Sequence, residues 1–272
     1  MLHLSNLHSA RLKGEQVARR VLFGTPLFLP LRSIYQRMFS REKWQFWNQM
    51  IQFYAHFIRP SDVVFDVGAN IGVYAEVFSR LGATVVAIEP NAECCEKIKV
   101  IARMRKIFIE NCAAGETVGT AEFHLCEENT MSTLNEQWVE AVSKSELHSQ
   151  TKWLNKVQVP VKTLDVLANQ YGKPSFIKID AEGYDDHVLA GMSFQPAALS
   201  FEFNVNGRDV ALDCLKTPVL SEGFVFNYTM GHNFRYQLDD WVTATELAER
   251  LRTFDGPEEY GEVFARRAKT DH

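Results

Sequence analysis

The chain has 272 residues, 46% of them hydrophobic, and a formal net charge of −5, which suits one soluble domain with a substantial core and a smaller appendage. Its five cysteines show neither C-x-x-C spacing nor a disulfide framework, which argues against a zinc site and favours a reducing compartment. The longest apolar candidate, residues 26–31, is broken by proline, is too short to span a bilayer and lacks a signal-peptide cleavage pattern. We therefore expect a cytoplasmic protein.

Charge is distributed unevenly along the chain. Residues 1–60 hold nine Lys or Arg against two acids, a net +7, so the remainder carries −12. Five apolar residues of this arm recur at three- and four-residue steps: Phe46, Met50, Phe53, Tyr54 and Phe57. Residues 41–58 are therefore predicted to form an amphipathic helix that ends before Pro60. We expect it to pack as a cap over the crevice of the following domain or in a homodimer contact; peripheral contact with an anionic membrane is the alternative.

Two short β-rich runs follow, at residues 63–67 and 84–88, with a helix predicted between them over residues 71–81. The turn Asp66-Val67-Gly68-Ala69-Asn70-Ile71-Gly72 joins the first run to this helix, and the second run ends at Glu89. In an α/β fold this arrangement makes a nucleoside-binding crevice, because the helix N-terminus receives a polar group and the acid bonds a ribose.

The spacing of the glycine turn limits which class of nucleoside ligand the crevice could bind. A dinucleotide site favours G-x-G-x-x-G, but here Gly68 and Gly72 stand four apart and Asp66 precedes them. An acid ahead of the turn suits an ammonium group and would repel a diphosphate. S-adenosylmethionine carries an ammonium group and a ribose but no phosphate, so it is the predicted cofactor.

The rest of the chain alternates predicted strands and helices. Strands are predicted at residues 107–112 (continuing loosely to 114), 121–126, 157–161, 176–179, 199–203 and 224–228, with 262–265 as a last edge strand. Helices are predicted at residues 91–103, with Asn91 as N-cap, and at 136–147, 163–171, 184–191, 209–220 and 243–251, the last opened by the capping box Thr243-x-x-Glu246. The predicted fold class is α/β, with a mostly parallel central sheet and helices on both faces.

Two acids and a glycine follow the strand at 176–179, in the run Asp180-Ala181-Glu182-Gly183. Ligands bind at this carboxyl edge of open α/β sheets, and Asp180 and Glu182 share a face because they lie two residues apart. Paired acids can also hold a divalent ion, but no further ligand motif accompanies them, and no metal is predicted.

Six segments carry a family resemblance: D-V-G-A-N-I-G at 66–72, I-E-P-N at 88–91, N-C-A-A at 111–114, M-S-T-L at 131–134, K-T-L-D-V-L at 162–167 and I-K-I-D-A-E-G at 177–183. With them the chain resembles the FkbM-type methyltransferases, a branch of the S-adenosylmethionine-dependent Rossmann-like superfamily, over about residues 61–226. Asp185 departs from the family pattern, in which a glutamate is usual. The arm before Pro60 and most of the chain after Tyr228 lie outside the pattern.

The resemblance implies methyl transfer from S-adenosylmethionine, most often to a hydroxyl of a sugar, a glycan or glycolipid, or another secondary metabolite. We predict a Rossmann-like domain over residues 61–272, with a substrate-covering insertion around 121–160, behind a helical extension over residues 1–60. The cofactor-binding residues that it implies are Asp66, Gly68, Ala69, Asn70, Gly72, Tyr74, Glu89, Pro90, Asn91, Asn111, Cys112, Ala113 and Asp180. Among these, Glu89 would accept from the ribose hydroxyls and residues 111–113 would border the adenine.

A sugar hydroxyl is barely ionised at neutral pH, so a positioned proton acceptor should assist the transfer. Asp180 and Glu182 are the first candidates, and Glu202 at the end of the next strand is the third. His232, in a loop, is a weaker candidate because histidine is also an ordinary loop residue.

Two other classes of function remain open at this point, a nicotinamide-dependent oxidoreductase and a catalytically silent nucleoside-binding module. The missing G-x-G-x-x-G argues against the first, and the intact acids at 66, 89, 180 and 182 argue against the second. A nucleic-acid acceptor is disfavoured because no N-P-P-Y-like tetrapeptide follows the strand at 176–179. The arginines of the basic arm would instead suit an anionic small-molecule or glycan acceptor.

Overall fold

A computed structural model describes residues 41–144, 151–205, 207–256 and 259–268. Most of the predicted basic arm, residues 1–40, therefore lies outside the described residues, as does the end of the helix predicted at 136–147. None of the described helices combines the length and the apolar character that crossing a membrane requires.

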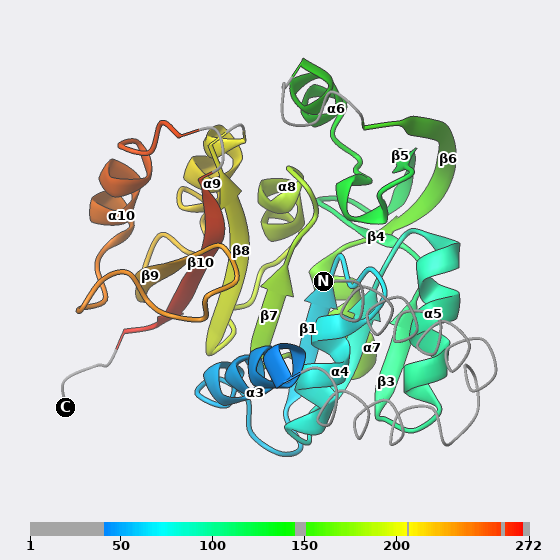
Figure 1. The fold of residues 1–272 in the computed structure, drawn as a ribbon, viewed down its shortest axis with the longest axis horizontal. Coiled ribbons are helices and arrows are strands. Elements are labelled where there is room, and N and C mark those ends of the chain that lie inside the picture. Colours follow the sequence, from blue (N-terminus) through cyan, green and yellow to red (C-terminus); the bar gives the residue numbers. More distant parts are fainter. Residues whose placement is uncertain (1–40, 145–150, 206, 257–258, 269–272) are drawn as a thin grey trace, which may run out of the picture.

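The centre of the fold is a seven-stranded sheet in the order β3-β2-β1-β7-β8-β10-β9 (Figure 1). Its strands are β1 Val63–Val67, β2 Thr84–Ile88, β3 Ile107–Glu110, β7 Phe176–Ile179, β8 Ala198–Asn204, β9 Phe224–Met230 and β10 Tyr260–Arg267. In this sheet β3, β2, β1, β7 and β8 run parallel, whereas β10 is antiparallel to both β8 and β9. The α/β fold class is confirmed, and β1, β2 and β7 have the predicted bounds.

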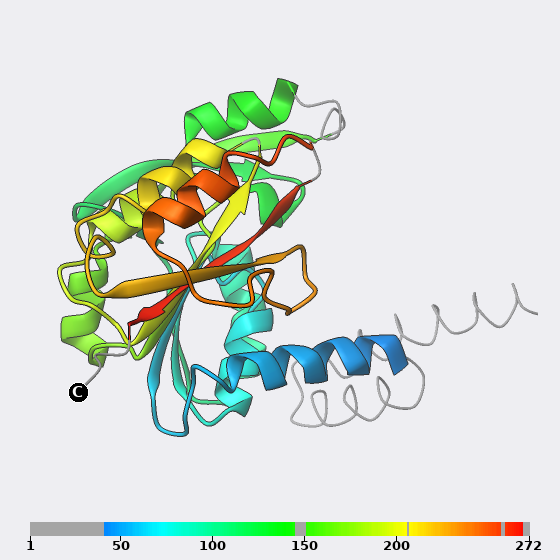
Figure 2. The same ribbon diagram turned by 90° about the vertical axis from the view of Figure 1, so that its left-hand side faces the viewer.

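Helices cover both faces of this sheet, and Figure 2 shows the strands between the two groups. The first group is α3 Arg41–Tyr54, α4 Val73–Arg80 and α5 Ala92–Ala102; the second is α7 Leu164–Tyr171, α8 Asp185–Ala190, α9 Arg208–Cys214 and α10 Ala244–Leu251. Each group buries an apolar cluster against its own face of the sheet. Apolar burial on both faces explains why the central strands read as continuous apolar runs.

Helix α3 buries one side of the aromatic stripe predicted from the sequence. Met50 and Tyr54 are 1% and 0% exposed, and Phe53 packs edge-on against Phe264 of β10 at 5.1 Å between ring centroids. The helix ends at Tyr54, four residues before the predicted end, and the chain continues in turns. The described part of the N-terminal extension is therefore packed on the sheet.

A second, three-stranded sheet in the order β4-β6-β5 interrupts the main alternation. It consists of β4 Ala113–Ala114, β5 Gly119–Cys126 and β6 Trp153–Lys162, and the helices η1 Asn129–Met131 and α6 Glu136–Lys144 lie between its long strands in the chain. Figure 1 shows this unit beyond the carboxyl ends of β1 and β7. These residues include the predicted insertion around 121–160, and its substrate-covering role stays a prediction.

Three expectations about elements were wrong. The strand predicted from 107 to 112 ends at Glu110, because the Cys112 amide turns back to the Glu110 carbonyl and the chain leaves the sheet to pair with β6. The strand at 262–265 is interior rather than an edge, because β10 inserts between β8 and β9. The helix predicted at 209–220 ends at Cys214, shortly before Pro218, which cannot continue a helix.

Candidate active site

The glycine turn after β1 lies directly against the end of β7. The amides of Gly68 and Ala69 both donate to the Ile88 carbonyl, at 3.0 and 3.2 Å. Gly68 has φ +74°, and a Cβ built on it would lie 1.8 Å from the backbone oxygen of Asp180. Only glycine allows both this backbone conformation and so close an approach to the Asp180 backbone. The glycine turn therefore packs directly against the predicted site residue Asp180.

Glu89 is fixed by the two loops that flank it. Its carboxylate accepts the amides of Asn70 and Asn91, each at 2.7 Å. The Asn111 side chain donates to the Glu89 and Pro90 carbonyls at 3.0 Å each, and these two hydrogen bonds stabilise the loop after β2. Burial raises the pKa of Glu89 to about 7. The carboxylate keeps free lone pairs on the side that lines the pocket, where ribose hydroxyls could donate.

Asp66 is 1% exposed, and its Oδ2 has no hydrogen-bond partner among the described residues. Burial raises the pKa of Asp66 to about 7, and the neighbouring Lys178 lowers it in part. An unpartnered buried carboxylate oxygen is expensive in a folded protein unless a ligand satisfies it. A cationic donor such as the ammonium group of S-adenosylmethionine fits this position, so the residues present are compatible with that cofactor.

Lys178 on β7 is 3% exposed, and its ammonium lies 2.7 Å from Oδ2 of Asp180 and 4.4 Å above the Tyr74 ring centroid. Burial by itself lowers the pKa of Lys178, but Asp180 and Glu262 raise it well above its ordinary value, so the lysine is charged. The ion pair fixes one oxygen of Asp180 and leaves the other for a ligand.

Three predicted catalytic acids come together at the carboxyl ends of β7 and β8. One carboxylate oxygen each of Asp180, Glu182 and Glu202 lies within 4.8 Å of the other two. Burial and then the charge of Glu202 raise the pKa of Glu182, and burial and then the charge of Asp180 raise that of Glu202. Glu202 Oε2 has no partner among the described residues. Such a trio can accept a proton, and its oxygens are also ligands that a divalent cation accepts.

A pocket of about 610 Å³ lies in front of these groups. Nine of the predicted site residues line it: Gly68, Ala69, Asn70, Tyr74, Glu89, Pro90, Ala113, Asp180 and Glu182. Six others are not among its lining residues: Asp66, Gly72, Asn91, Asn111, Cys112 and Glu202. Of these, Asn91 caps α5 by accepting the Glu93 amide at 2.9 Å. The volume is in the range of cofactor and substrate sites.

The rest of the pocket lining comes from residues outside the predicted cofactor-binding and catalytic set, although His232 was named as a weaker candidate. They are Phe46 and Met50 of α3, His232 after β9, and Phe123, Glu127, Glu128, Asn129, Thr130, Ser132 and Leu134 of the insertion, joined by Val67, Ile71, Val73, Ile88, Ala114, Ala181 and Tyr184 beside the predicted motifs. The M-S-T-L segment at 131–134 was a signal for part of this lining. Phe46 and Met50 were predicted to be buried, and nothing in their pattern separates a core position from a pocket-lining one.

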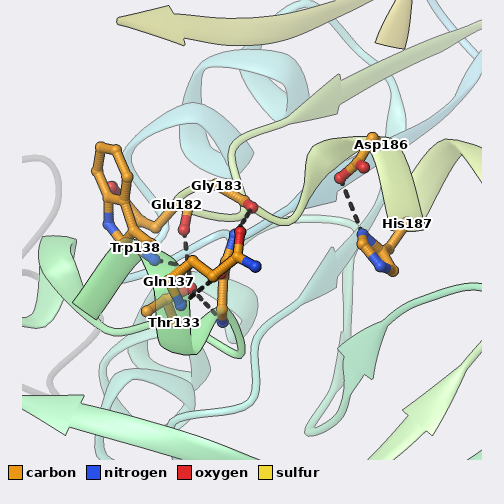
Figure 3. A network of polar contacts seen from close by, with 8 residues as sticks. Thr133, Gln137, Trp138, Glu182, Gly183, Asp186 and His187 are labelled. Carbon is orange, nitrogen blue, oxygen red and sulfur yellow. Dashed lines mark hydrogen bonds and ion pairs between the residues drawn. The ribbon is translucent and has the colours of Figure 1, made fainter. Parts of the chain in front are cut away.

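The insertion is pinned to the turn after β7 (Figure 3). The Thr133 hydroxyl donates to the Glu182 carbonyl at 2.7 Å, and the Asn135 side chain donates to the Gly183 carbonyl at 2.5 Å. Trp138 covers Gly183, where a Cβ would lie 3.2 Å from the indole ring. The position of Glu182, at a left-handed φ of 51°, is thus set by the insertion as well as by its own strand.

The sequence profile of the FkbM methyltransferase domain matches residues 66–228. A search of curated proteins found no match.

Solved structures give distant similarities. A precorrin-6y C5,15-methyltransferase from Geobacter metallireducens has 8% identity and a TM-score of 0.42, covering 81% of this chain and 87% of that chain. An rRNA methylase from Streptococcus thermophilus has 8% identity and a TM-score of 0.40, covering 80% and 94%. A putative O-methyltransferase from Klebsiella pneumoniae has 7% identity and a TM-score of 0.41, covering 82% and 80%.

Proposed function

This chain belongs to the FkbM methyltransferase family, and on that premise we propose that it methylates a hydroxyl oxygen of a sugar, a glycan or glycolipid, or another secondary metabolite. Family membership makes the chain a methyltransferase and indicates S-adenosylmethionine as its cofactor. The observation that supports oxygen as the acceptor atom is the trio Asp180, Glu182 and Glu202, since a hydroxyl must lose a proton when it is methylated.

The residues that would hold the cofactor lie around the glycine turn and have carboxylate oxygens that can still accept hydrogen bonds. The free Oδ2 of Asp66 suits the ammonium group, and the pocket-facing side of Glu89 suits the ribose hydroxyls. When bound, S-adenosylmethionine supplies a methyl group already activated on a sulfonium. The protein then has to orient the acceptor and exclude water, and the insertion and α3 surround the pocket for that purpose.

The proton of the acceptor hydroxyl would move to the carboxylates beyond Asp180. Asp180 is tied to Lys178 at 2.7 Å, whereas no cation is paired with Glu182 or Glu202 in the described residues. A raised pKa makes the ionised form of a carboxylate a stronger base, because proton affinity and pKa rise together. Of the three acids, the Glu182–Glu202 pair is therefore the better proton acceptor, and Asp180 the better anchor.

Methyl incorporation is the direct test of this function. The purified protein is incubated with S-adenosylmethionine carrying a labelled methyl group and with cell extracts separated into polar and lipid fractions. We expect label in a small molecule or glycan, on an ether oxygen identified by mass spectrometry. Label on nitrogen, carbon or nucleic acid would refute the proposed acceptor while leaving the family assignment intact.

Calorimetry tests the cofactor independently of the acceptor. S-adenosylmethionine and S-adenosylhomocysteine should bind saturably with micromolar affinity, and NADH should give no heat. Saturable heat with NADH and none with either sulfur nucleoside would overturn the proposal.

Amide variants test the proton acceptor. Glu182→Gln or Glu202→Gln should lower turnover about 10²–10⁴-fold with nearly unchanged cofactor affinity. Glu222→Gln, on an exposed turn, is the matched control and should behave as the unmodified chain does. If the two variants mainly weaken cofactor binding or stability, the acids are structural. If a chelator abolishes activity and magnesium restores it, the trio holds a metal instead.

A further inference from the structure

One buried lysine lies among several acids near the carboxyl ends of β1, β7 and β8. Lys178 is in register with Asp66 of β1 and with Ser200 of β8, so the three side chains leave the same face. The charge of Lys178 lowers the pKa of five acids around it: Asp66, Glu182, Asp185, Glu202 and Glu262. The lysine is thus shared among several acids and is more than the partner of Asp180 alone.

The surroundings of Lys178 extend to elements outside the segment that matches the family. The Ser200 hydroxyl donates to Glu262 of β10 at 2.6 Å, and the Tyr54 hydroxyl of α3 donates to the other oxygen of Glu262 at 3.0 Å. The Tyr54 ring packs edge-on against Tyr74 at 5.8 Å, and Tyr74 lies under the lysine ammonium. Helix α3 and strand β10 therefore close a polar network around Lys178.

We propose that Lys178 is a positioning residue: it holds Asp180 at the pocket edge and sets the net charge that the cofactor encounters. Lys178 does not line the pocket, so it acts through Asp180, which does. The inference rests on the proposed function, because it takes S-adenosylmethionine as the ligand of this pocket.

Two ligands of nearly equal shape can measure that charge. S-adenosylmethionine has a positive sulfonium, and S-adenosylhomocysteine has a neutral thioether in its place. Loss of a buried cation makes the site more negative, and charges separated by several ångströms in a protein interior interact strongly enough to change an affinity about tenfold. The ratio of the two dissociation constants therefore reports the charge of Lys178, whereas a general loss of structure weakens both ligands together.

The experiment measures both dissociation constants by calorimetry for the unmodified chain, Lys178→Met and Lys178→Arg. Lys178→Met should increase the preference for S-adenosylmethionine over S-adenosylhomocysteine about tenfold. Lys178→Arg should keep the original ratio, because it restores the charge. Lys216→Met is the matched control, since Lys216 also contacts an aspartate at 2.7 Å but is exposed. It should leave the ratio unchanged.

A variant of opposite sign covers the case in which Lys178→Met does not fold. Glu262→Gln removes one negative charge from the network while keeping polar partners for Ser200 and Tyr54, so it should lower the preference for S-adenosylmethionine. An unchanged ratio in either variant, or an equal loss of both affinities, overturns the proposal and makes Lys178 a structural residue. If neither ligand binds the unmodified chain, the proposed function has failed instead.

Discussion

Replacing Gly68 by alanine should damage both the stability and the cofactor site of this protein. The new methyl group would lie 1.8 Å from the Asp180 backbone oxygen and 2.8 Å from its carbonyl carbon, and both are backbone atoms. No rotamer change can relieve this overlap. The turn after β1 would have to move away from β7, and the ends of the two strands that carry Asp66 and Asp180 would separate.

The loss of stability expected for Gly68→Ala has two parts. A left-handed backbone costs a non-glycine residue about 1–2 kcal/mol, and forcing an extra methyl group into a packed position costs about 1–3 kcal/mol. Gly68→Ala should therefore lower the free energy of unfolding by about 2–5 kcal/mol. Gly223 isolates the first part, because it has φ +77° but its Cβ would lie 3.7 Å from the nearest atom, Arg267 Cζ. Gly223→Ala should lose only about 1–2 kcal/mol.

Urea denaturation of the two variants and the unmodified chain measures the difference, and calorimetry with S-adenosylmethionine measures the site. Gly68→Ala should unfold at a lower urea concentration than Gly223→Ala, with an affinity reduced about tenfold or more, whereas Gly223→Ala should bind normally. If both variants are equally stable and both bind normally, the close packing of the glycine turn on Asp180 is not what holds the site together.

Three further predictions concern the buried acids and the cap of helix α10. Burial raises the pKa of Asp66 to about 7, and a cationic ligand favours the ionised form of Asp66. The affinity for S-adenosylmethionine, measured by calorimetry, should therefore rise about tenfold between pH 6 and pH 8. Asp66→Asn should flatten that rise. Asp66, Glu89 and Asp185 all have pKa values raised to about 7, so the ligand-free folded chain holds protons that the unfolded chain releases. Its free energy of unfolding, measured in urea, should therefore fall as the pH rises from 5 to 8. A free energy of unfolding that rises with pH would contradict the burial of these three acids. Thr243→Ala removes the side-chain acceptor of the Glu246 amide and should lower stability by about 1 kcal/mol, while Thr243→Ser, which keeps an equivalent hydroxyl, should not.

The sequence predicted the parallel half of the sheet better than the antiparallel half. Strands β1, β2 and β7 are buried on both faces, so each reads as a short apolar run with clear limits. Strand β10 was recognised in part, but its position between β8 and β9 was not. Pairing with a distant strand is a tertiary choice, and the local pattern of a strand does not say which neighbours it takes.

In the candidate site, too, some features could be predicted from the sequence and others could not. Asp180, Glu182 and Glu202 were expected at one edge of the sheet because carboxyl ends of parallel strands meet there, and the structure brings them within 4.8 Å. Their catalytic roles stay predictions. The Lys178–Asp180 ion pair was not foreseen, because a lysine in an apolar strand does not indicate which acid it contacts. The link from Tyr54 to Glu262 joins residues more than 200 positions apart, and no local pattern reports such a contact.

Three residues that line the pocket come from outside the segment that matches the family, and this bears on how one family could serve different acceptors. The wall that carries Gly68, Glu89 and Asp180 lies within the segment that matches the family, and its groups suit the cofactor. Phe46, Met50 and His232 also line the pocket but lie outside that segment, and the ring centroids of Phe46 and His232 are 6.4 Å apart. Lining residues from outside the shared segment can change without disturbing the cofactor residues. We therefore expect substitutions at Phe46 and His232 to alter the acceptor that is methylated more than the affinity for S-adenosylmethionine.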